Sequence, residues 1–556
     1  MDYSNLYYYK SRKNEKRDER ITRDLIVYGA TPAGITCAIQ AKKMGLTVVI
    51  AEFGRHIGGM TASGLGATDF GAKEAIGGLS REFYRRIGEY YGKDEQWTFE
   101  PKAASSVFTD WLNEYEIPVH LNQHPEKVVM QDRKIKRIIM ENGTVYEGSY
   151  FVDASYEGDI MARADVSYAV GRESNAIYNE TYNGVRFGEP HHKFEVRVDP
   201  YVVEGDLGSG LLPGVTEPEE GTLDNGGGDR RIQAYNFRIC LTKNPDQRIP
   251  FPRPSSYDPE KYALLLRYIR AGVWDAMKLH IMLPNGKSDL NNHGAVSTDY
   301  IGMNHEWPDG GYETRERIFQ EHVNYDLGML YFLSHDERVP ESIRKEVGEW
   351  GLPEDEFPET GHWPQQLYIR EARRMVSDYV MTDRNCLGQT KVEDSIGLAS
   401  YQMDSHHCRR VVIDGKCVNE GDVEIPISPY PISYRAVRPK ADECTNVLVP
   451  VCLSSSHIAY GSIRMEPVFM IIGQSVGAAV SLAFREAGPV QDVDYVKLKE
   501  ELLNAGQVLE WDATMEDDPV KRMKETFGKN NPESVHIRTI RVVCCSLTAQ
   551  SFLKPI

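Results

Sequence analysis

The sequence predicts an α/β fold, in which a Rossmann-like nucleotide-binding domain carries an inserted α+β domain. Two observations lead to this prediction. Residues 23–60 read in order as an apolar strand, a glycine-bearing turn, a helix of small residues, a second strand ending in an acid, and a Gly-Gly turn. Residues 171–360 then break the regular pattern with many Pro, Gly, Asn and aromatic residues, and the regular pattern returns after them. A chain of 556 residues is too long for one simple core, so two or more intertwined domains are expected.

The first βαβ unit carries the strongest functional signal. A strand over residues 25–28 ends at Gly29, and the backbone must turn sharply into a helix that begins near Pro32, whose fixed φ suits a first helical turn. Amide groups at a helix N-terminus have no partner within the helix, and the helix dipole adds about half a positive charge there. We therefore expect a diphosphate to bind against this turn. Its residues are Gly29, Thr31, Pro32, Ala33 and Gly34.

Two details of this unit decide how strong the signal is. Thr31 stands where the usual GxGxxG pattern has its middle glycine, so only Gly29 and Gly34 remain of the three. The second strand, residues 47–51, is followed by Glu52, which is placed to accept hydrogen bonds from a ribose. An ordinary βαβ unit without a ligand is the alternative. The order of strand, turn, helix, strand and acid favours nucleotide binding.

The rest of the first domain is predicted from periodicity and turn residues. Apolar residues at four-residue spacing predict a helix over 77–91, and a second helix is predicted over 104–115. Short strands are predicted over 118–122, 127–131, 134–140 and 144–147, with Asn142-Gly143 as a hairpin turn. Residues 150–159 read as an apolar strand that runs into a Gly-Asp turn, which is suited to bringing backbone close to a dinucleotide.

The later segments are predicted in the same way. Helices are expected over 259–278 and 315–334, and the glycine-rich residues 221–231 as a mobile surface loop. Residues 366–382 are predicted as a long charged helix, with Arg370, Arg373 and Arg374 beside Glu371 in an exposed or interdomain charge network and substrate binding as the alternative for these arginines. A buried strand is predicted over 446–451. An apolar helix over 466–485 is rich in Gly and Ala, which allow close approach to another backbone or a flat ligand.

These segments divide the chain into five parts. Residues 1–22 form a disordered or extended N-terminal arm, 23–170 the first part of the nucleotide-binding domain, and 171–360 a substrate or cap domain. Residues 361–510 return to the nucleotide-binding domain and end in the apolar helix, and 511–556 form a C-terminal tail without a predicted role.

Composition narrows the class of protein. Lys+Arg 64 against Asp+Glu 82 gives a formal net charge of -18, which argues against a nucleic-acid or anionic-membrane partner. The first twenty residues lack the apolar core of a secretory signal, so a soluble cytoplasmic protein is expected. The nine cysteines have no CxxC spacing, which favours reduced thiols over a disulfide framework or a zinc site. Cys544 and Cys545 are interpreted as part of an apolar C-terminal strand, with a redox-active pair as the alternative.

Seven segments together resemble the FAD-dependent oxidoreductases of the glutathione-reductase-like fold, in the branch whose members are often labelled xanthan lyase. The resemblance runs from Asp24 to about Leu509, and it says little about the substrate, because function does not follow from fold. The segments are YGATPAGI (28–35), GRHIGGMTASGLG (54–66), VDASYEGD (152–159), YAVGRES (168–174), YIREARRMVSDYVMT (368–382), DSIGLASYQMDSHH (394–407) and HIAYGSIRMEPVFMIIGQSVGAA (457–479).

This resemblance implies FAD as the cofactor, bound across the first βαβ unit and the late apolar helix. The turn at 29–34 would then hold the diphosphate and Glu52 the adenosine ribose. Related proteins often carry a Gly-Asp pair after the last strand; Pro450-Val451-Cys452 stand there in this chain, so no residue is assigned to that ribityl contact. The other implied FAD contacts are Gly58, Gly59 and Met60 along the phosphates and ribityl chain, Val128 at the adenine, Ala154, Gly158 and Asp159 in the third segment, and Ser462 before the late helix.

Flavin carries the electron chemistry, so the protein must orient the substrate and supply acid and base groups. His406 is the leading candidate for a proton acceptor, since imidazole titrates near neutrality. His457 and Arg464 stand just before the late helix, whose N-terminal dipole would face the flavin. Tyr434 and Arg435 are candidates for binding a substrate oxygen or carboxylate. The alternatives are a purely hydrogen-bonding role for each histidine and an ion pair of Arg464 with Glu466.

Three functions remain open from the sequence. The first is an FAD-dependent oxidoreductase that acts by hydride transfer on a polar small molecule, with a carbohydrate or polyol as the favoured substrate and an unknown electron acceptor. The second is a non-redox lyase of the polysaccharide type, and the third a flavin-binding protein without turnover. No metal is expected, because neighbours such as His191-His192 or His406-His407 cannot easily share one tetrahedral ion. The oligomeric state is not predicted.

Overall fold

A mixed, mostly parallel sheet organises the first domain. The computed structural model describes residues 3–219 and 221–511. Strands β3 (Val119–His120), β2 (Val48–Ala51), β1 (Arg20–Tyr28) and β6 (Val145–Asp153) lie side by side and run parallel, and β19 (Val447–Leu448) also pairs with β6. The antiparallel strands β5 (Lys134–Met140) and β4 (Pro125–Gln131) complete the sheet. Helix α1 (Pro32–Lys43) is the crossover that a parallel β1–β2 pair requires.

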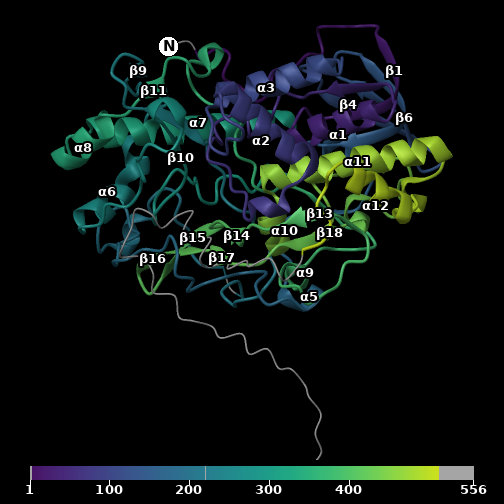
Figure 1. The fold of residues 1–556 in the computed structure, drawn as a ribbon. Helices are drawn as coiled ribbons and strands as arrows, with labels where there is room; N and C mark the ends of the chain where they lie inside the picture. The colour runs from purple at the N-terminus through teal and green to yellow at the C-terminus, as the bar shows by residue number, and fades with distance from the viewer. Residues whose placement is uncertain (1–2, 220, 512–556) are drawn as a thin grey trace, which may run out of the picture.

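Two helices far apart in the sequence pack on each other beside this sheet (Figure 1). A Cβ atom on Gly473 of α11 (Glu466–Glu486) would collide with the carbonyl oxygen of Ala33 in α1, so the small residues are needed for this close packing. The hydroxyl of Thr36 donates to the carbonyl of Met470 (2.9 Å). Among the described residues, α11 is the one helix long and apolar enough to cross a membrane, and it lies buried in the core.

The predicted elements of the first domain form with shifted ends. The helices predicted over 77–91, 104–115 and 466–485 are confirmed as α2 (Gly78–Tyr90), α3 (Pro101–Glu114) and α11. The strands predicted over 144–147 and 150–159 join into the single strand β6, because its first half pairs with β5 and its second half with β19. Two short helices, α4 (Asp159–Arg163) and α12 (Tyr495–Asn504), complete this part.

The inserted segment builds the opposite end of the molecule, where Figure 1 shows α6 and α8. The helix predicted over 315–334 is confirmed as α7, whereas the one predicted over 259–278 is a 3-10 turn followed by α6, which ends before Gly272, a glycine with φ +94°. The elements are α6 (Ala263–Arg270), α7 (Tyr312–His335), α8 (Glu341–Gly348) and the strand pairs β8 (Ile239–Thr242) with β10 (Lys287–Leu290) and β9 (Arg248–Ile249) with β11 (Leu352–Pro353).

Four further two-stranded ribbons and three short helices lie between these two ends. Most of these ribbons and helices carry polar residues that are described below. They are β7 (Tyr168–Ala169) with β12 (Arg374–Met375), β13 (Ser395–Ala399) with β18 (Tyr430–Ser433), β14 (Met403–Ser405) with β17 (Val423–Ile425), β15 (Arg409–Ile413) with β16 (Lys416–Glu420), α5 (Asn175–Tyr178), α9 (Asp383–Cys386) and α10 (His457–Ile463).

The long charged helix predicted over 366–382 is wrong. This segment contains no helix, and its only named element is the two-residue strand β12. Arg370, Glu371 and Arg374 are buried instead of exposed. Arg374 donates to the carbonyl oxygens of Gly171 (2.6 Å) and Ser455 (3.1 Å), which lie on separate parts of the chain. Buried ion pairs and backbone contacts thus override the helical propensity of the residues.

The N-terminal arm is also more ordered than predicted. Leu6 and Tyr9 are buried, whereas most residues from 10 to 19 are exposed. Strand β1 starts at Arg20, before the predicted boundary at residue 23.

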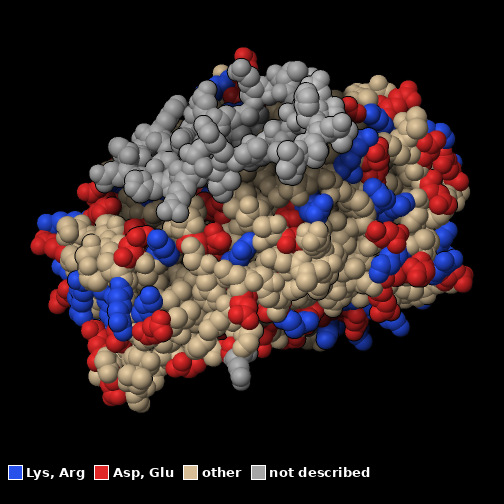
Figure 2. All heavy atoms as spheres, turned by 90° about the horizontal axis from the view of Figure 1, so that it is seen from below, with Lys and Arg blue, Asp and Glu red and all other residues tan. Residues whose placement is uncertain are grey.

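The remaining sequence predictions concern charge, cysteines and the tail. Figure 2 shows one face of the molecule on which acidic and basic side chains are interspersed along the rim. The cysteines of the described residues are all buried and free: Cys37, Cys240, Cys386, Cys408, Cys417, Cys444 and Cys452. The interpretation of Cys544 and Cys545 lies outside the described residues, as does the C-terminal tail beyond Trp511.

Candidate functional site

The glycine turn after β1 brings two backbone segments into contact. Gly29 has φ +101°, and a Cβ atom there would lie 2.8 Å from the carbonyl carbon of Ala154 and 2.9 Å from the amide nitrogen of Ser155. A Cβ on Gly34 would collide with the carbonyl oxygen of Gly29. Gly58 donates its amide to the carbonyl of Ala30 (2.7 Å), so the predicted Gly-Gly turn lies against the first turn. Glycine is required here because backbone packs directly on backbone.

Thr31 fits this turn although glycine is usual there. Its side chain caps α1 by accepting from the amide of Gly34 (3.3 Å), and its hydroxyl donates to the carbonyl of Ala154 (2.8 Å). The hydroxyl is therefore engaged as donor and as acceptor with neighbouring backbone groups. The amides of Thr31 and Ala33 have no partner within the helix and can serve an anion.

Glu52 closes the turn at the end of β2. One carboxylate oxygen accepts from the amide of Ala30 (2.5 Å) and the other from the amide of Gly54 (2.6 Å). Burial raises the pKa of Glu52, and these two hydrogen bonds oppose the shift. Each oxygen keeps a second lone pair, so the carboxylate can still accept from a ribose hydroxyl, as predicted.

A cavity follows the path that the sequence predicts for a dinucleotide. It starts at Glu52, passes the turn at Gly29 and Thr31, and reaches Tyr156 and Ser63. It encloses about 810 Å³ of space between atoms, including its open mouth. The other residues that line it are Tyr7, Tyr8, Tyr28, Phe53, Gly54, Arg55, His56, Gly59, Asn122, His124, Ser155, Glu157, Gln365 and Gln366.

Tyr156 in the wall of this cavity is bonded to Glu466, the first residue of α11. A Cβ on Gly59 would collide with the hydroxyl of Tyr156, which accepts from the amide of Met60 (3.0 Å) and donates to Glu466 (2.8 Å). Thr61 donates to the other oxygen of Glu466 (2.9 Å). Burial raises the pKa of Glu466 to about 7, against these hydrogen bonds. The Gly-Gly turn and α11 are thus held together where the flavin end of the cofactor is expected.

Of the fourteen residues predicted to contact FAD, Gly29, Thr31, Glu52 and Gly59 line this cavity and the other ten do not. Four of those ten have other surroundings in the described residues. Val128 is buried within β4, and Gly158 is the left-handed N-cap of α4. Asp159 forms ion pairs with Arg315 (2.7 Å) and Arg373 (2.8 Å), which hold its pKa below the ordinary range although burial alone would raise it. The hydroxyl of Ser462 donates to the carbonyl of Tyr401 (2.6 Å). Each of these four is packed or bonded within the protein in the described residues, and its contact with FAD stays a prediction.

His406 lies in a second, buried polar cluster. Its Nδ1 lies 2.7 Å from a carboxylate oxygen of Asp299, and the other oxygen of Asp299 lies 2.9 Å from a guanidinium nitrogen of Arg370. Arg370 and His406 hold the pKa of Asp299 below its ordinary range against the effect of burial. Burial and the Arg370 charge lower the pKa of His406 to about 3. Nδ1 therefore carries the proton toward Asp299, and Nε2 keeps its lone pair.

Arg464 joins this cluster through Asp404. Arg464 lies 3.2 Å from a carboxylate oxygen of Asp404 and donates to the hydroxyl of Tyr368 (2.9 Å). Asp404 also lies 3.8 Å from Nε2 of His406, and burial raises its pKa to about 7 although Arg464 opposes this. The alternative ion pair of Arg464 with Glu466 is wrong, since Glu466 bonds Thr61 and Tyr156 instead.

Four titratable side chains gather on one face of the β14–β17 ribbon. Asp404 pairs with Glu424 across the strands. His406 directly follows β14 and lies 3.8 Å from Asp404, and Asp422 directly precedes β17 and lies beside Glu424. Residues two apart in a strand share a face, so this face carries three carboxylates and one imidazole. Asp422 is buried, and one of its oxygens has no hydrogen-bond partner among the described residues.

Two groups in the described residues have the spacing of metal ligands, and each has a resident partner. The first is His192 with Asp422 and Glu424. Nε2 of His192 lies 3.4 Å from Glu424, and its Nδ1 accepts from the amide of Gly294 (3.1 Å), so both ring nitrogens are used. The second group surrounds the ammonium of Lys287: Glu100, Asp355 and Glu356.

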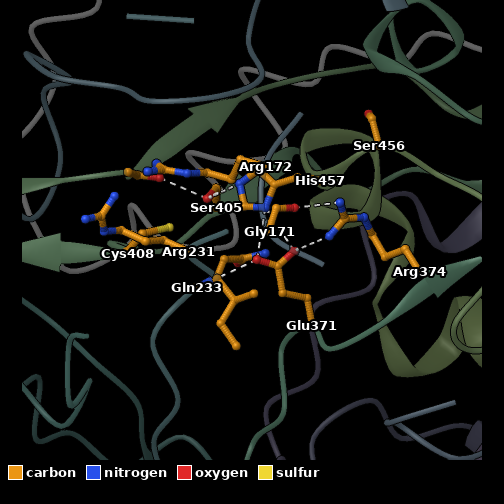
Figure 3. A network of polar contacts seen from close by, with 12 residues as sticks. Gly171, Arg172, Arg231, Gln233, Glu371, Arg374, Ser405, Cys408, Ser456 and His457 are labelled. Carbon is orange, nitrogen blue, oxygen red and sulfur yellow. Dashed lines mark hydrogen bonds and ion pairs between the residues drawn. The ribbon is translucent and has the colours of Figure 1, made fainter. Parts of the chain in front are cut away.

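His457 takes a hydrogen-bonding role in an adjacent network (Figure 3). Its Nδ1 lies 2.9 Å from Glu371, and its Nε2 lies 3.0 Å from the hydroxyl of Ser405. Arg374 bonds the same carboxylate (3.2 Å). His457 is 2% exposed and both of its nitrogens are engaged, which leaves no free atom for a substrate.

Tyr434 and Arg435 lie apart from both regions. The hydroxyl of Tyr434 donates to the carbonyl of Val490 (2.6 Å). Arg435 forms two hydrogen bonds with Asp394 (3.1 and 3.2 Å) and stacks on Tyr379. Neither lines the cavity or contacts the His406 cluster.

Asp299 and Asp404 were not singled out from the sequence, and substrate binding by Arg370 was considered only as an alternative. Asp299 stands in an irregular segment of the inserted domain, where no local pattern marks it. Arg370 was assigned to a helix that does not form. Asp404 had a usable signal, because Asp404 and His406 alternate as strand residues do.

A glycine turn, an acid at the end of β2 and a cavity that both of them line are the features of a dinucleotide-binding protein of the Rossmann-like class. The chain belongs to the FAD dependent oxidoreductase family, whose sequence model matches residues 24–502. FAD is therefore its cofactor, and the turn, Glu52 and the cavity fit that group. No curated protein matches the chain.

Solved flavoprotein structures resemble only part of this chain. They include a flavin monooxygenase from Stenotrophomonas maltophilia (12% identity, 28% of this chain and 42% of that chain, TM-score 0.18) and L-proline dehydrogenase from P. horikoshii (15%, 28% and 59%, 0.23). THI4 from Thermovibrio ammonificans is similar over 27% of this chain and 66% of its own, with 18% identity and a TM-score of 0.22. The matched part thus spans less than two thirds of each of these three structures, and the family match carries the assignment.

Proposed function

We propose that this FAD-dependent oxidoreductase oxidises a C–OH group of a polar small molecule, a carbohydrate or polyol, with His406 as the proton acceptor. The observation that carries the proposal is the pairing of His406 with Asp299 through Nδ1 (2.7 Å), which leaves Nε2 free to accept. The residue is neutral at neutral pH because its pKa is lowered to about 3.

Oxidation of a C–OH group releases a proton and a hydride. Bound FAD supplies the two-electron acceptor for the hydride. The hydroxyl proton passes to Nε2 of His406, and Asp299 stabilises the imidazolium through Nδ1–H. Asp404, 3.8 Å from Nε2 and with a pKa of about 7, is placed to share the charge that arrives there.

The acid-lined face of β14–β17 favours a substrate with several hydroxyl groups. Carboxyl oxygens accept hydrogen bonds from hydroxyl groups, and a protonated carboxyl group also donates one. Burial raises the pKa of Asp422 well above its ordinary value, so this carboxyl group can do both. Asp422 and Glu424 extend this face beyond the Asp404–His406 pair, and one oxygen of Asp422 has no protein partner in the described residues. Arg370 and Arg464 supply donors beside the same face, so both functions of a hydroxyl group can be met.

The neighbouring polar segment connects this cluster with the cofactor cavity. Gln365 and Gln366 line the cavity, and Tyr368 and Arg370 of the same extended segment belong to the cluster. Arg464 faces the cluster, while Glu466, two residues later, is bonded to Tyr156 in the cavity wall.

The test is anaerobic mixing of the purified yellow protein with a panel of monosaccharides and linear polyols, with absorbance at the oxidised flavin band as the readout. We expect bleaching with at least one hydroxyl-bearing compound, no bleaching with its deoxy analogue at the reacting carbon, and recolouring with oxygen or a quinone. A protein that retains FAD but is bleached by no compound of the panel contradicts the proposed substrate class. Product formation from a polysaccharide without bleaching would indicate the lyase instead.

A further inference from the structure

The first part of the N-terminal arm, residues 3–9 and called the arm below, forms part of the cofactor cavity although it lies outside the family match. That match begins at residue 24. Tyr7 and Tyr8 line the cavity together with Glu52, Gly29 and Thr31, so the arm lies at the end where the adenosine of FAD is expected. No motif in the sequence marked these residues for a role in binding.

Tyr8 is anchored by both its ring and its hydroxyl. The ring stacks on Phe53 with centroids 4.6 Å apart and meets Trp307 edge-on at 4.7 Å. The hydroxyl donates to Glu157 (3.2 Å), another residue of the cavity wall, and accepts from Arg315 (3.4 Å). Phe53 follows Glu52 directly in the sequence, so the arm is fixed against the segment that would carry the ribose.

The backbone of the arm is tied to α7 of the inserted domain. The amides of Tyr8 and Tyr9 both donate to one carboxylate oxygen of Glu316 (2.7 and 2.8 Å). Gln320, one turn further along α7, donates to the carbonyl of Leu6 (2.8 Å). Leu6 is buried, so the arm is held by a short apolar anchor as well as by these hydrogen bonds.

Tyr7 adds a contact with the first domain. Its ring has the guanidinium of Arg55 and the ammonium of Lys10 each 3.9 Å from its centroid. Arg55 also lines the cavity and donates to the carbonyl of Asn5. The arm therefore bridges α7 and the turn after β2 across the adenosine end of the cavity.

We propose that residues 3–9 form a wall of the FAD site and retain the adenosine half of the bound cofactor. The arm supplies two of the aromatic side chains in the cavity, and its anchors, Glu316 and Leu6, lie outside the cavity lining. A cofactor in the cavity can leave on that side only when these anchors open.

Two variants test this in the full-length holoprotein. Tyr8→Ala removes the ring from the wall, and Glu316→Ala releases the backbone anchor without changing a residue that lines the cavity. Tyr90→Ala, at a tyrosine that is 47% exposed, and Glu321→Ala, at a neighbouring position of α7, are the matched controls. The readout is the rate of FAD release after dilution, followed by the rise in free-flavin fluorescence, and the affinities of the stripped protein for FAD and for FMN.

We expect release to be about tenfold faster in both variants, as loss of one aromatic contact allows, with FMN affinity within about twofold of wild type. The controls should release FAD at the wild-type rate. Release within about twofold of wild type in Glu316→Ala and Tyr8→Ala would overturn the proposal, as would an equal loss of FAD and FMN. Slower release would also overturn it, since the arm would then compete with FAD. Measurements of FAD release and of FAD and FMN affinity need no substrate, so their outcome does not depend on the proposed function.

Discussion

The turn at Gly29 and the cluster around His406 are both buried and both polar, but they are built from different parts of the chain. The turn uses backbone amides and missing side chains, and its residues lie within one βαβ unit. The cluster uses charged side chains from four distant segments, represented by Asp299, Arg370, His406 and Arg464. Backbone shape suits a constant ligand such as the diphosphate of FAD, whereas paired side chains suit proton transfer and a substrate. The two regions should therefore fail in different ways when altered.

The largest effect is expected from Gly29→Ala. The new Cβ would lie 2.8 Å from the backbone of Ala154 at a φ of +101°. We expect FAD affinity to fall about a hundredfold or more, measured by the ratio of flavin to protein absorbance after purification. Gly45→Ala is the control, because Gly45 has φ +98° but no atom within 4 Å of the new Cβ. A yellow Gly29→Ala protein would mean that this turn does not hold the diphosphate.

The second-largest effect is expected on stability, in the network around His457 and not in the His406 cluster. Glu371→Gln removes the buried charge that faces Arg374 and His457. Because a buried ion pair loses about 3 kcal/mol or more when one partner is removed, we expect the free energy of unfolding to drop by about that amount in urea. Glu341→Gln, in an exposed pair with Lys345, should change it by about 0.5 kcal/mol or less. Equal changes in the two variants would argue against a structural role of the network.

Glu466 lies where the two regions meet, and its protonation can be tested by the pH dependence of the free energy of unfolding. Burial raises its folded pKa to about 7, above the ordinary value of 4.5, so the folded state binds this proton more tightly than the unfolded state. Its contribution to stability is present below about pH 4.5 and is lost as the pH rises to about 7, up to about 3 kcal/mol. Urea unfolding at pH 5 and pH 8 should therefore show a smaller loss in Glu466→Gln than in wild type. A loss of the same size in both proteins would show that Glu466 ionises normally.

The smallest effect is expected from Thr31→Val. The change removes the side-chain cap of α1 and the hydrogen bond to Ala154. We expect the unfolding free energy to fall by about 1 kcal/mol, with full FAD content retained. Loss of flavin comparable to that of Gly29→Ala would show that the hydroxyl, rather than the backbone, binds the diphosphate.

These two regions also differ in how far the sequence could predict them. Gly29, Thr31, Gly34 and Glu52 lie in one local pattern whose geometry follows from the helix start and the strand end, so the turn was predictable. The cluster depends on the β14–β17 pairing and on the extended path of residues 366–382. The latter was predicted as a helix because its charged residues favour one when their buried partners are unknown.

His406 and His457 show the same limit at single residues. Both stand in polar segments near the predicted flavin end, and both were candidates for catalysis, with His406 the leading one. The structure distinguishes them through their partners: Asp299 leaves one nitrogen of His406 free, while Glu371 and Ser405 occupy both nitrogens of His457. Such partners are set by tertiary contacts and are not visible in spacing.

The most direct measurement of the division between the two regions is the rate constant of anaerobic flavin reduction by a reactive polyol or sugar in His406→Gln, at matched FAD content. We expect FAD content equal to wild type and a rate constant lower by about a hundredfold or more, since a positioned base contributes about 10²- to 10⁴-fold. Reduction at the wild-type rate in fully loaded His406→Gln would contradict the assignment of the proton to His406.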